Sequence, residues 1–348
     1  SISFKALEKI TVEGEVLDAS GQLVTDFTGI VNPTVKDSKV TVTCLKNSNK
    51  DDSPAFTFTD YPNTIFIGND SVRNGKFSFT FTVPKDISYS NLQGKMNLYA
   101  VDTESGNEAQ GNFDNFIVGG TSDTAETDTI GPEIRALYLN DTTFVDGGQV
   151  NTTPYFVAEL WDKSGVNITG SSVGHDMMLV IDESTVLSYN LNSYYELLPG
   201  EDGTGIVKFP IPALEPGKHT AEFWVWDILN NSTVRTFTFE VVEGLKPFLF
   251  DVIATPGIAR EQVTFHLMHN RPESRMRVGI MVYDLAGRQL WKHEESGTSG
   301  LFDNYTVSWD LTSGGARMRP GVYIYRAAIS TDNSKDATKA RKFIILGE

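Results

Sequence analysis

The residues best suited to acid–base or metal chemistry in this chain are His175 and Asp176, which follow Gly174. An imidazole and a carboxylate can bind a metal ion or exchange a proton when a turn brings them together. Adjacent residues on a strand point to opposite faces, so this pair could act together only within a turn. The simpler interpretation is a turn in which Asp176 accepts hydrogen bonds from backbone amides and His175 packs. We favour that interpretation.

The single cysteine, Cys44, has no second cysteine with which to form an internal disulfide. It follows the alternating segment 40–43, so we expect it to pack as a small core side chain on the face that carries two valines. A nucleophilic cysteine needs a base, and no sequence feature supplies one. The remaining histidines show no spacing typical of a zinc site: His219, His266, His269 and His293. We therefore predict no catalytic residue, no metal site and no cofactor.

Acidic and amide residues gather in several loops in the middle of the chain. Their oxygen atoms are ligands of the kind that calcium prefers. None of the loops has the regular spacing of a dedicated calcium site, and such side chains stabilise turns in any β-sandwich. We favour turn stabilisation and leave calcium binding open for these residues: Asp141, Asp146, Asp162, Asn167, Asp227 and Asn230.

The pattern that must position such residues is one of short strands. The chain has 348 residues, a hydrophobic fraction of 40%, 30 glycines and 14 prolines. Runs such as 77–83 and 237–241 alternate between apolar and polar residues at the period of a strand. We predict an all-β protein of three consecutive immunoglobulin-like β-sandwich domains, at 1–121, 122–245 and 246–348, with a Thr- and Asp-rich linker at 121–129.

The net charge of −16 is distributed unevenly along the chain. The three predicted domains carry −5, −14 and +3, respectively. An acidic total argues against nucleic acid as a partner, because binding to phosphates requires a basic surface. The mildly basic last domain could instead be steered toward an acidic partner surface. No window is long and apolar enough to span a bilayer, and the first residues do not have the pattern of a signal peptide.

The last hundred residues contain three ordered strand signals. Residues 278–283 alternate, residues 284–287 supply a turn, and residues 289–291 resume an extended run, which together predict a hairpin. Residues 321–326 predict another strand that starts after a proline, and residues 343–346 predict a last strand. Their residues and order resemble the C-terminal sorting domain of proteins exported by the type IX secretion system of Bacteroidetes.

That resemblance rests on three elements of the family pattern. They are a Tyr-Asp-x-x-Gly-Arg hairpin at 283–288, a Gly-x-Tyr strand at 321–323, and a terminal strand with a lysine followed by aliphatic residues at 342–346. A longer polar stretch between 291 and 305 departs from the usual spacing and leaves the register of the middle strands open. We expect contacts with a partner from these residues: Tyr283, Arg288, Tyr323, Lys339, Arg341 and Lys342.

Segments across the rest of the chain are similar to a second family, the gingipain-related sortases of the same secretion system. The segments occur in one order: Gly75–Phe77, Val83–Ile87, Gly119–Gly120, Gly131–Ile134, Tyr138–Asp141, Asp162–Asn167, Gly174–Asp176, Asn192–Tyr195 and Trp226–Asn231. The resemblance implies a surface cysteine endopeptidase and transpeptidase that removes sorting domains from cargo and attaches the cargo to lipopolysaccharide. Nothing in this chain matches the family's peptidase domain, so no catalytic residue is assigned.

The same resemblance implies a partner and a location. The sortase retains its own sorting domain, which holds it to an outer-membrane β-barrel protein of the PorV type at the cell surface. This chain would then dock and position the enzyme, and deletion from Lys246 onward should abolish capture by the barrel.

A second hypothesis remains open: a secreted adhesin or carbohydrate-binding protein whose sorting domain is cleaved. In that case aromatic side chains would stack on sugars: Tyr194, Tyr195, Trp224 and Trp226.

Overall fold

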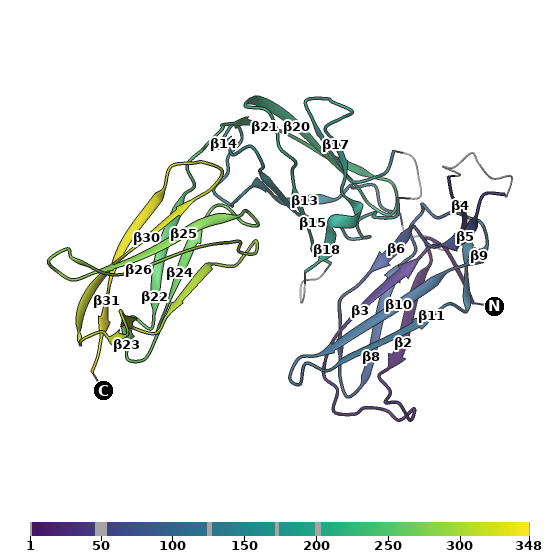
Figure 1. The fold of residues 1–348 in the computed structure, drawn as a ribbon. Coiled ribbons are helices and arrows are strands. Elements are labelled where there is room, and N and C mark those ends of the chain that lie inside the picture. The colour runs from purple at the N-terminus through teal and green to yellow at the C-terminus, as the bar shows by residue number, and fades with distance from the viewer. Residues whose placement is uncertain (1, 46–53, 124–126, 171–173, 199–202, 348) are drawn as a thin grey trace. The chain divides into compact units, whose positions relative to one another are not determined.

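The computed structural model describes residues 2–45, 54–123, 127–170, 174–198 and 203–347. In these ranges the chain forms short β-strands and one turn of 3-10 helix, η1 (Asn192–Tyr194) (Figure 1). The prediction of an all-β protein is confirmed. Among the described residues, no helix has the length and apolar character needed to cross a membrane.

The chain divides into two compact units. The first comprises 1–137, 158–208 and 220–237, and the second comprises 138–157, 209–219 and 238–348. The division runs through the strands of the middle block, so the three predicted domain boundaries stay a prediction.

The strands before residue 122 form four sheets. The first has the order β1 (Ile2–Ala6), β12 (Phe116–Thr121), β9 (Leu92–Gln93). The second has the order β11 (Glu108–Phe113), β10 (Lys95–Asp102), β3 (Gly29–Lys36), β6 (Thr64–Ile67), and β7 (Asp70–Val72) also pairs with β3. The other two are the pairs β2 (Lys9–Glu15), β8 (Lys76–Thr82) and β4 (Val40–Thr43), β5 (Thr57–Asp60). The alternation predicted for 77–83 is confirmed, because Phe77, Phe79 and Phe81 are buried. They join Val31, Val35 and Met96 of the neighbouring sheet in one core, as two packed sheets require.

The expectation for Cys44 is wrong. Cys44 is exposed and lies just after β4, which pairs only with β5. A two-stranded sheet has no second layer over it, so the valines on its face are only half-buried and the cysteine beyond them has no core to enter.

The middle strands form two sheets. One has the order β13 (Glu133–Leu139), β15 (Tyr155–Trp161), β19 (Gly205–Pro210), β18 (Tyr195–Leu197), and the other β14 (Gln149–Val150), β21 (Ser232–Val241), β20 (Gly217–Trp226), β16 (Met178–Ile181), β17 (Ser188–Asn190). Asn230 and Asn231 lie in the turn between β20 and β21. Asn230 has a φ of 72°, a left-handed conformation that asparagine adopts more readily than most residues.

The last strands form a sandwich of two main sheets. One has the order β22 (Leu249–Thr255), β24 (Val263–His269), β27 (Tyr305–Trp309), and the other β23 (Ile258–Ala259), β31 (Ala337–Ile345), β30 (Gly321–Ser330), β25 (Met276–Tyr283), β26 (Gln289–Gly297), beside the short pair β28 (Thr312–Ser313), β29 (Ala316–Arg317). The hairpin, the Gly321 strand and the final strand are thus confirmed as strands, and they pair as neighbours in one sheet.

Aromatic and aliphatic residues of both sheets fill the core of this sandwich. Tyr325 is 2% exposed and packs against Phe265 and Phe343, with ring centroids 4.9 and 5.8 Å away. Its hydroxyl donates to the carbonyl of Val252 in the opposite sheet, over 3.0 Å. The aromatic ring supplies buried apolar area, and the hydroxyl finds the partner that a buried polar group needs.

Candidate functional site

The turn of the C-terminal hairpin explains why its motif has the residues it has. The carboxylate of Asp284 accepts hydrogen bonds from the backbone N–H groups of Ala286 and Arg288, over 3.0 and 2.9 Å. These donors, the backbone bond from Arg288 first, hold the pKa of Asp284 below its usual value. Gly287 has a φ of 83°, which favours glycine. The Asp and Gly of the motif therefore build the turn.

Arg288 is the exposed member of the same turn. Its Nε lies 3.1 Å from Oδ2 of Asp284, and its side chain is 77% exposed. An exposed ion pair of this kind contributes little to stability. Because most of its side chain is exposed, the guanidinium of Arg288 is accessible to a partner.

Tyr323 lies in the core instead of on the surface. It is 8% exposed, its ring packs near Phe343, and its hydroxyl donates to the carbonyl of Arg319 over 2.7 Å. Any role of this residue in docking therefore acts through the fold of the domain.

Lys339 and Arg341 connect β31 to β22 of the opposite sheet. The ammonium of Lys339 donates to the carbonyl of Phe250, and the guanidinium of Arg341 lies 2.9 Å from the carboxylate of Asp251. Both basic groups thus have partners within the sandwich, which leaves them less available to an outside partner than Arg288.

On the outer face of the β31–β30–β25 sheet, Tyr283 and Lys342 lie in one cross-strand row, with Ile324 between them. In the strand register Tyr283 lies opposite Ile324, and Ile324 lies opposite Lys342. The next row contains Val322, Ile344 and Ile258 in register. These last three are 41%, 37% and 55% exposed. We call Ile258, Tyr283, Val322, Lys342 and Ile344 the terminal face.

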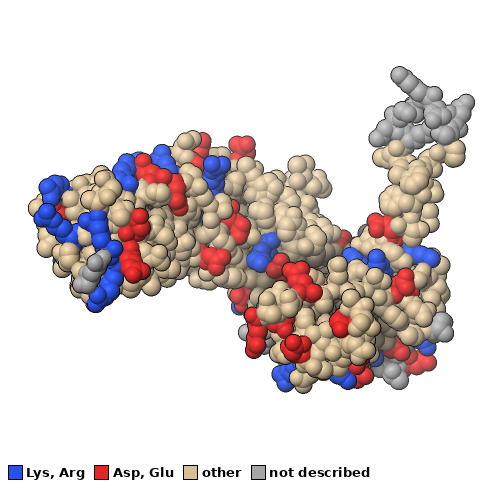
Figure 2. All heavy atoms as spheres, turned by 60° about the horizontal axis from the view of Figure 1, so that its bottom comes forward, with Lys and Arg blue, Asp and Glu red and all other residues tan. Residues whose placement is uncertain are grey.

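Basic side chains gather around this part of the chain. Figure 2 shows Lys and Arg spheres clustered on the part of the surface formed by β22 to β31, at the left of that view, with fewer on the middle strands. By sequence, residues 246–348 carry a net charge of +3 and residues 122–245 a net charge of −14.

His175 and Asp176 do not act as a pair. Nδ1 of His175 lies 2.7 Å from a carboxylate oxygen of Asp86, and its ring lies 4.5 Å from that of Trp226. Asp176 accepts a hydrogen bond from the side-chain amide of Asn192 over 2.7 Å. The predicted packing of His175 is confirmed. Among the described residues, Asp176 accepts from the side-chain amide of Asn192 in η1 and not from the backbone N–H groups that we expected.

Asp86 is a residue that sequence reasoning missed. Its side chain is 8% exposed and accepts hydrogen bonds from the amides of Asn167 and Asn230, over 3.2 and 2.9 Å, in addition to its contact with His175. These partners are 81 to 144 residues away in sequence, so no local pattern could reveal them. All four residues lie within the first compact unit.

Three carboxylates come together in the same unit. The oxygen atoms of Asp128, Asp162 and Asp227 lie within 4.8 Å of one another, close enough to share a cation. Burial first, and then the neighbouring charges of Asp227 and Asp128, raise the pKa of Asp162 to about 6. Burial also raises the pKa of Asp227. Bringing like charges together favours the protonated acid.

Hydrogen bonds with turns already occupy these carboxylates. Asp162 accepts from the N–H groups of Ser164 and Gly165, and Asp227 accepts from those of Leu229 and Asn231. The predicted role in turns is confirmed for these two residues. It is also confirmed for Asp141 and Asn167, which accept from the N–H groups of Thr143 and Thr169, two residues further along the chain. Asp146 instead accepts from the N–H of Thr238 on β21, 92 residues away. Asn230 differs, because its amide donates to Asp86.

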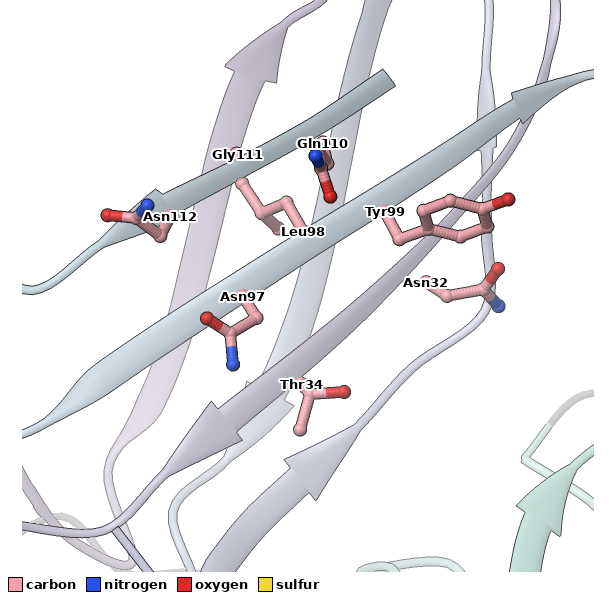
Figure 3. Close-up of a pocket in the computed structure, with 8 residues that line it drawn as sticks. All are labelled: Asn32, Thr34, Asn97, Leu98, Tyr99, Gln110, Gly111 and Asn112. Carbon is pink, nitrogen blue, oxygen red and sulfur yellow. The ribbon is translucent and has the colours of Figure 1, made fainter. Parts of the chain in front are cut away.

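A hollow of 570 Å³ lies on the sheet formed by β11, β10 and β3 (Figure 3). Eight residues line it, and none is charged: Asn32, Thr34, Asn97, Leu98, Tyr99, Gln110, Gly111 and Asn112. The sequence patterns gave no indication of it, because it depends on which strands are neighbours.

The aromatic residues proposed to stack on sugars occupy other environments. Tyr195 is 7% exposed, and burial raises its pKa. Trp226 packs against His175, and Nε1 of Trp224 donates to Glu222 over 3.1 Å. Tyr194 is 40% exposed. The four residues therefore do not form one aromatic platform.

Paired sheets that bury their apolar faces against each other define an all-β protein of immunoglobulin-like β-sandwiches, as predicted. A comparison with solved structures identifies a relative in sequence: dimeric latent PorU from Porphyromonas gingivalis is 37% identical over 100% of this chain. The match covers 32% of PorU, with a TM-score of 0.42. This chain is thus a PorU-related segment that spans about a third of that protein. The relation rests on the sequence identity, because the TM-score is too low to support an argument.

Other similar structures are immunoglobulin and fibronectin modules. The Ig1-2 module of the Drosophila receptor tyrosine phosphatase DLAR is 9% identical over 63% of this chain and all of that chain, with a TM-score of 0.25. The FN1-FN3 domains of chicken CNTN1 are 8% identical over 96% of this chain and 97% of that chain, with a TM-score of 0.22. Neither carries an argument about function. No protein-family model and no curated protein matches the chain.

Proposed function

We propose that this chain is the non-catalytic C-terminal part of a type IX secretion sortase, and that it docks the enzyme to an outer-membrane β-barrel partner of the PorV type. The observation that carries the proposal is the 37% identity to PorU along the full chain. The sorting-type motifs support it, because they fall on three adjacent strands of one sheet.

The catalytic work belongs to another part of the parent protein. That parent is a gingipain-like cysteine endopeptidase and transpeptidase of the cell surface, which removes C-terminal sorting domains from cargo and attaches the cargo to lipopolysaccharide. This division of work fits the present chain, because its described polar clusters stabilise turns or bond to Asp86.

The terminal face is the surface best suited to docking. It presents a row of exposed β-branched side chains, Ile258, Val322 and Ile344, beside the ammonium group of Lys342. Apolar area removed from water supplies most of the free energy of association, and neighbouring charge directs the encounter. Arg288, exposed at the hairpin turn, adds to the basic character of this domain.

Surface substitutions test this assignment in the full chain. We expect Val322→Asp to weaken binding to a purified barrel partner at least tenfold, because a carboxylate would enter the apolar row. Val234→Asp is the matched control: it is also a strand valine, 45% exposed compared with 41%, and it lies on β21. Equal affinity of the native chain and Val322→Asp would remove the terminal face from the proposal. Failure of the native chain to bind would reject the docking function.

A further inference from the structure

The hollow on the β11–β10–β3 sheet brings amide side chains into two cross-strand rows. Gln110, Tyr99 and Asn32 lie opposite one another in the first row. Asn112, Asn97 and Thr34 lie opposite one another in the second. Figure 3 shows these side chains on three neighbouring strands, with the ring of Tyr99 beside Asn32. We call these six residues the amide face.

The amide groups of this face are not used by the fold. Within the part of the chain that the structure describes, none of the side chains of Asn32, Asn97, Gln110 and Asn112 makes a hydrogen bond to the protein. By contrast, these five buried or half-buried asparagines of the middle strands and loops each have a protein partner: Asn140, Asn151, Asn167, Asn192 and Asn231. The amide face therefore offers four free donor and acceptor pairs to a ligand.

Local stability does not explain these residues. Asparagine and glycine are disfavoured in strands, yet Asn97 lies within the central strand β10 and Asn32 and Asn112 lie within its neighbours. The hairpin of β2 and β8 in the same block shows the ordinary alternative. Its outward residues pair across the strands, Thr11 with Thr80 by a hydrogen bond of 2.9 Å and Glu15 with Lys76 by an ion pair of 3.2 Å. Departures from local preference are expected at functional sites.

The lining also restricts the charge of the ligand. No charged residue lines the hollow, although the chain is 21% charged. The nearest charges along the strands stand beyond the two rows: Glu108, which hydrogen-bonds Tyr99 and raises its pKa, and the row of Lys36 and Lys95. A phosphate, sulfate or carboxylate ligand would find no cation at the centre of the face.

Size and chemistry together indicate a sugar. Rows two residues apart on strands spaced ~4.8 Å apart give a patch of roughly 7 by 10 Å, which suits one or two pyranose rings. Amides can both donate to and accept from neighbouring hydroxyl groups, and the 40% exposed ring of Tyr99 offers an apolar surface for the C–H face of a sugar. We infer that the amide face binds a neutral oligosaccharide.

A peptide is a poorer fit, because extended peptides bind sheet edges through backbone groups. The amide face instead lies on the side-chain surface of the sheet, across three strands that are hydrogen-bonded to one another, and not along the free edge of β11.

Affinity electrophoresis of the 348-residue chain tests the inference. The gels contain dextran, mannan, xylan or mixed-linkage β-glucan, with alginate as the charged comparison. We expect at least one neutral polymer to retard the chain. We do not expect the amide face to bind alginate and so to retard the chain in the alginate gel. Tyr99→Ala should weaken binding at least tenfold, whereas Tyr194→Ala, at the matched exposure of 40%, should not.

A second variant separates binding from folding. Asn97→Thr replaces an unfavourable strand residue by a favourable one, so it should preserve or raise the melting temperature while weakening retardation at least fivefold. The inference is overturned if no neutral polymer retards the native chain, or if Tyr99→Ala and Asn97→Thr bind as the native chain does. It is also overturned if these variants change only self-association, which would make the amide face a contact between copies.

Discussion

Replacing Asp162 by asparagine should stabilise the protein at neutral pH, an unusual outcome for the loss of a buried charge. Asp162 is 8% exposed and lies in the group of three carboxylates with Asp128 and Asp227. Asparagine keeps an oxygen in the place of Oδ1, so the bonds from Ser164 and Gly165 can persist. Its amide can also donate to the carboxylates that now repel Asp162.

The magnitude follows from the pKa of Asp162. Burial and like charge raise this pKa from 3.8 to about 6. A shift of that size corresponds to about 3 kcal/mol at 1.36 kcal/mol per pKa unit. Relaxation around the charge reduces the effect, so we expect a gain of ~1–3 kcal/mol at pH 7.5.

The sign depends on pH in a defined way. A carboxyl group with a raised folded pKa contributes stability below its unfolded pKa of 3.8, and that contribution is lost as the pH rises through about 6. The advantage of Asp162→Asn should therefore be near zero at pH 3.8 and complete above pH 7.

Urea unfolding at pH 4 and pH 7.5, with EDTA present, measures this difference. Asp146→Asn is the control with the opposite sign, because hydrogen bonds from Thr238 hold the pKa of Asp146 below its usual value. An Asp162→Asn variant that is less stable than the native protein at pH 7.5, or whose effect is the same at both pH values, would refute the reasoning.

Three further predictions concern other buried groups. Asp86→Ala should lower the free energy of unfolding by ~3 kcal/mol, because it leaves three side-chain donors without their acceptor; an unchanged urea midpoint would contradict this. Tyr325→Phe should cost ~1 kcal/mol, since the carbonyl of Val252 loses its hydroxyl donor, and a change below the error of the urea midpoint would count against it. Burial, and then Arg271, lower the pKa of His269 from 6.5 to about 4, so stability should fall as the pH drops from 6.5 toward 4, and His269→Gln should reduce that fall in acid-unfolding curves.

Strand periodicity made much of the fold predictable. Alternation in 77–83 identified the buried face of β8, and the turn residues at 284–287 located the C-terminal hairpin. These signals are local, because one strand must bury one face and one turn must adopt left-handed backbone angles. The exposure of Cys44 was not predictable, since it depends on β4 having only one neighbour.

The polar sites were less predictable because they join distant loops. Asp86 meets His175 across 89 residues, and Asp128 meets Asp162 and Asp227 only when three loops converge. The amide face likewise requires that β10 lie between β3 and β11. Single residues such as Asn97 looked ordinary in the sequence, and only the strand register showed that they form a surface.

We propose that residues 246–348 dock through the terminal face. Hydroxyl-radical footprinting of the full chain, with and without the purified PorV-type barrel, reports the solvent exposure of its side chains directly. We expect the oxidation of Val322 and Ile344 to fall several-fold when the barrel is added, while that of Val234 stays unchanged. Unchanged oxidation across the terminal face, or protection confined to residues before 242, would contradict it.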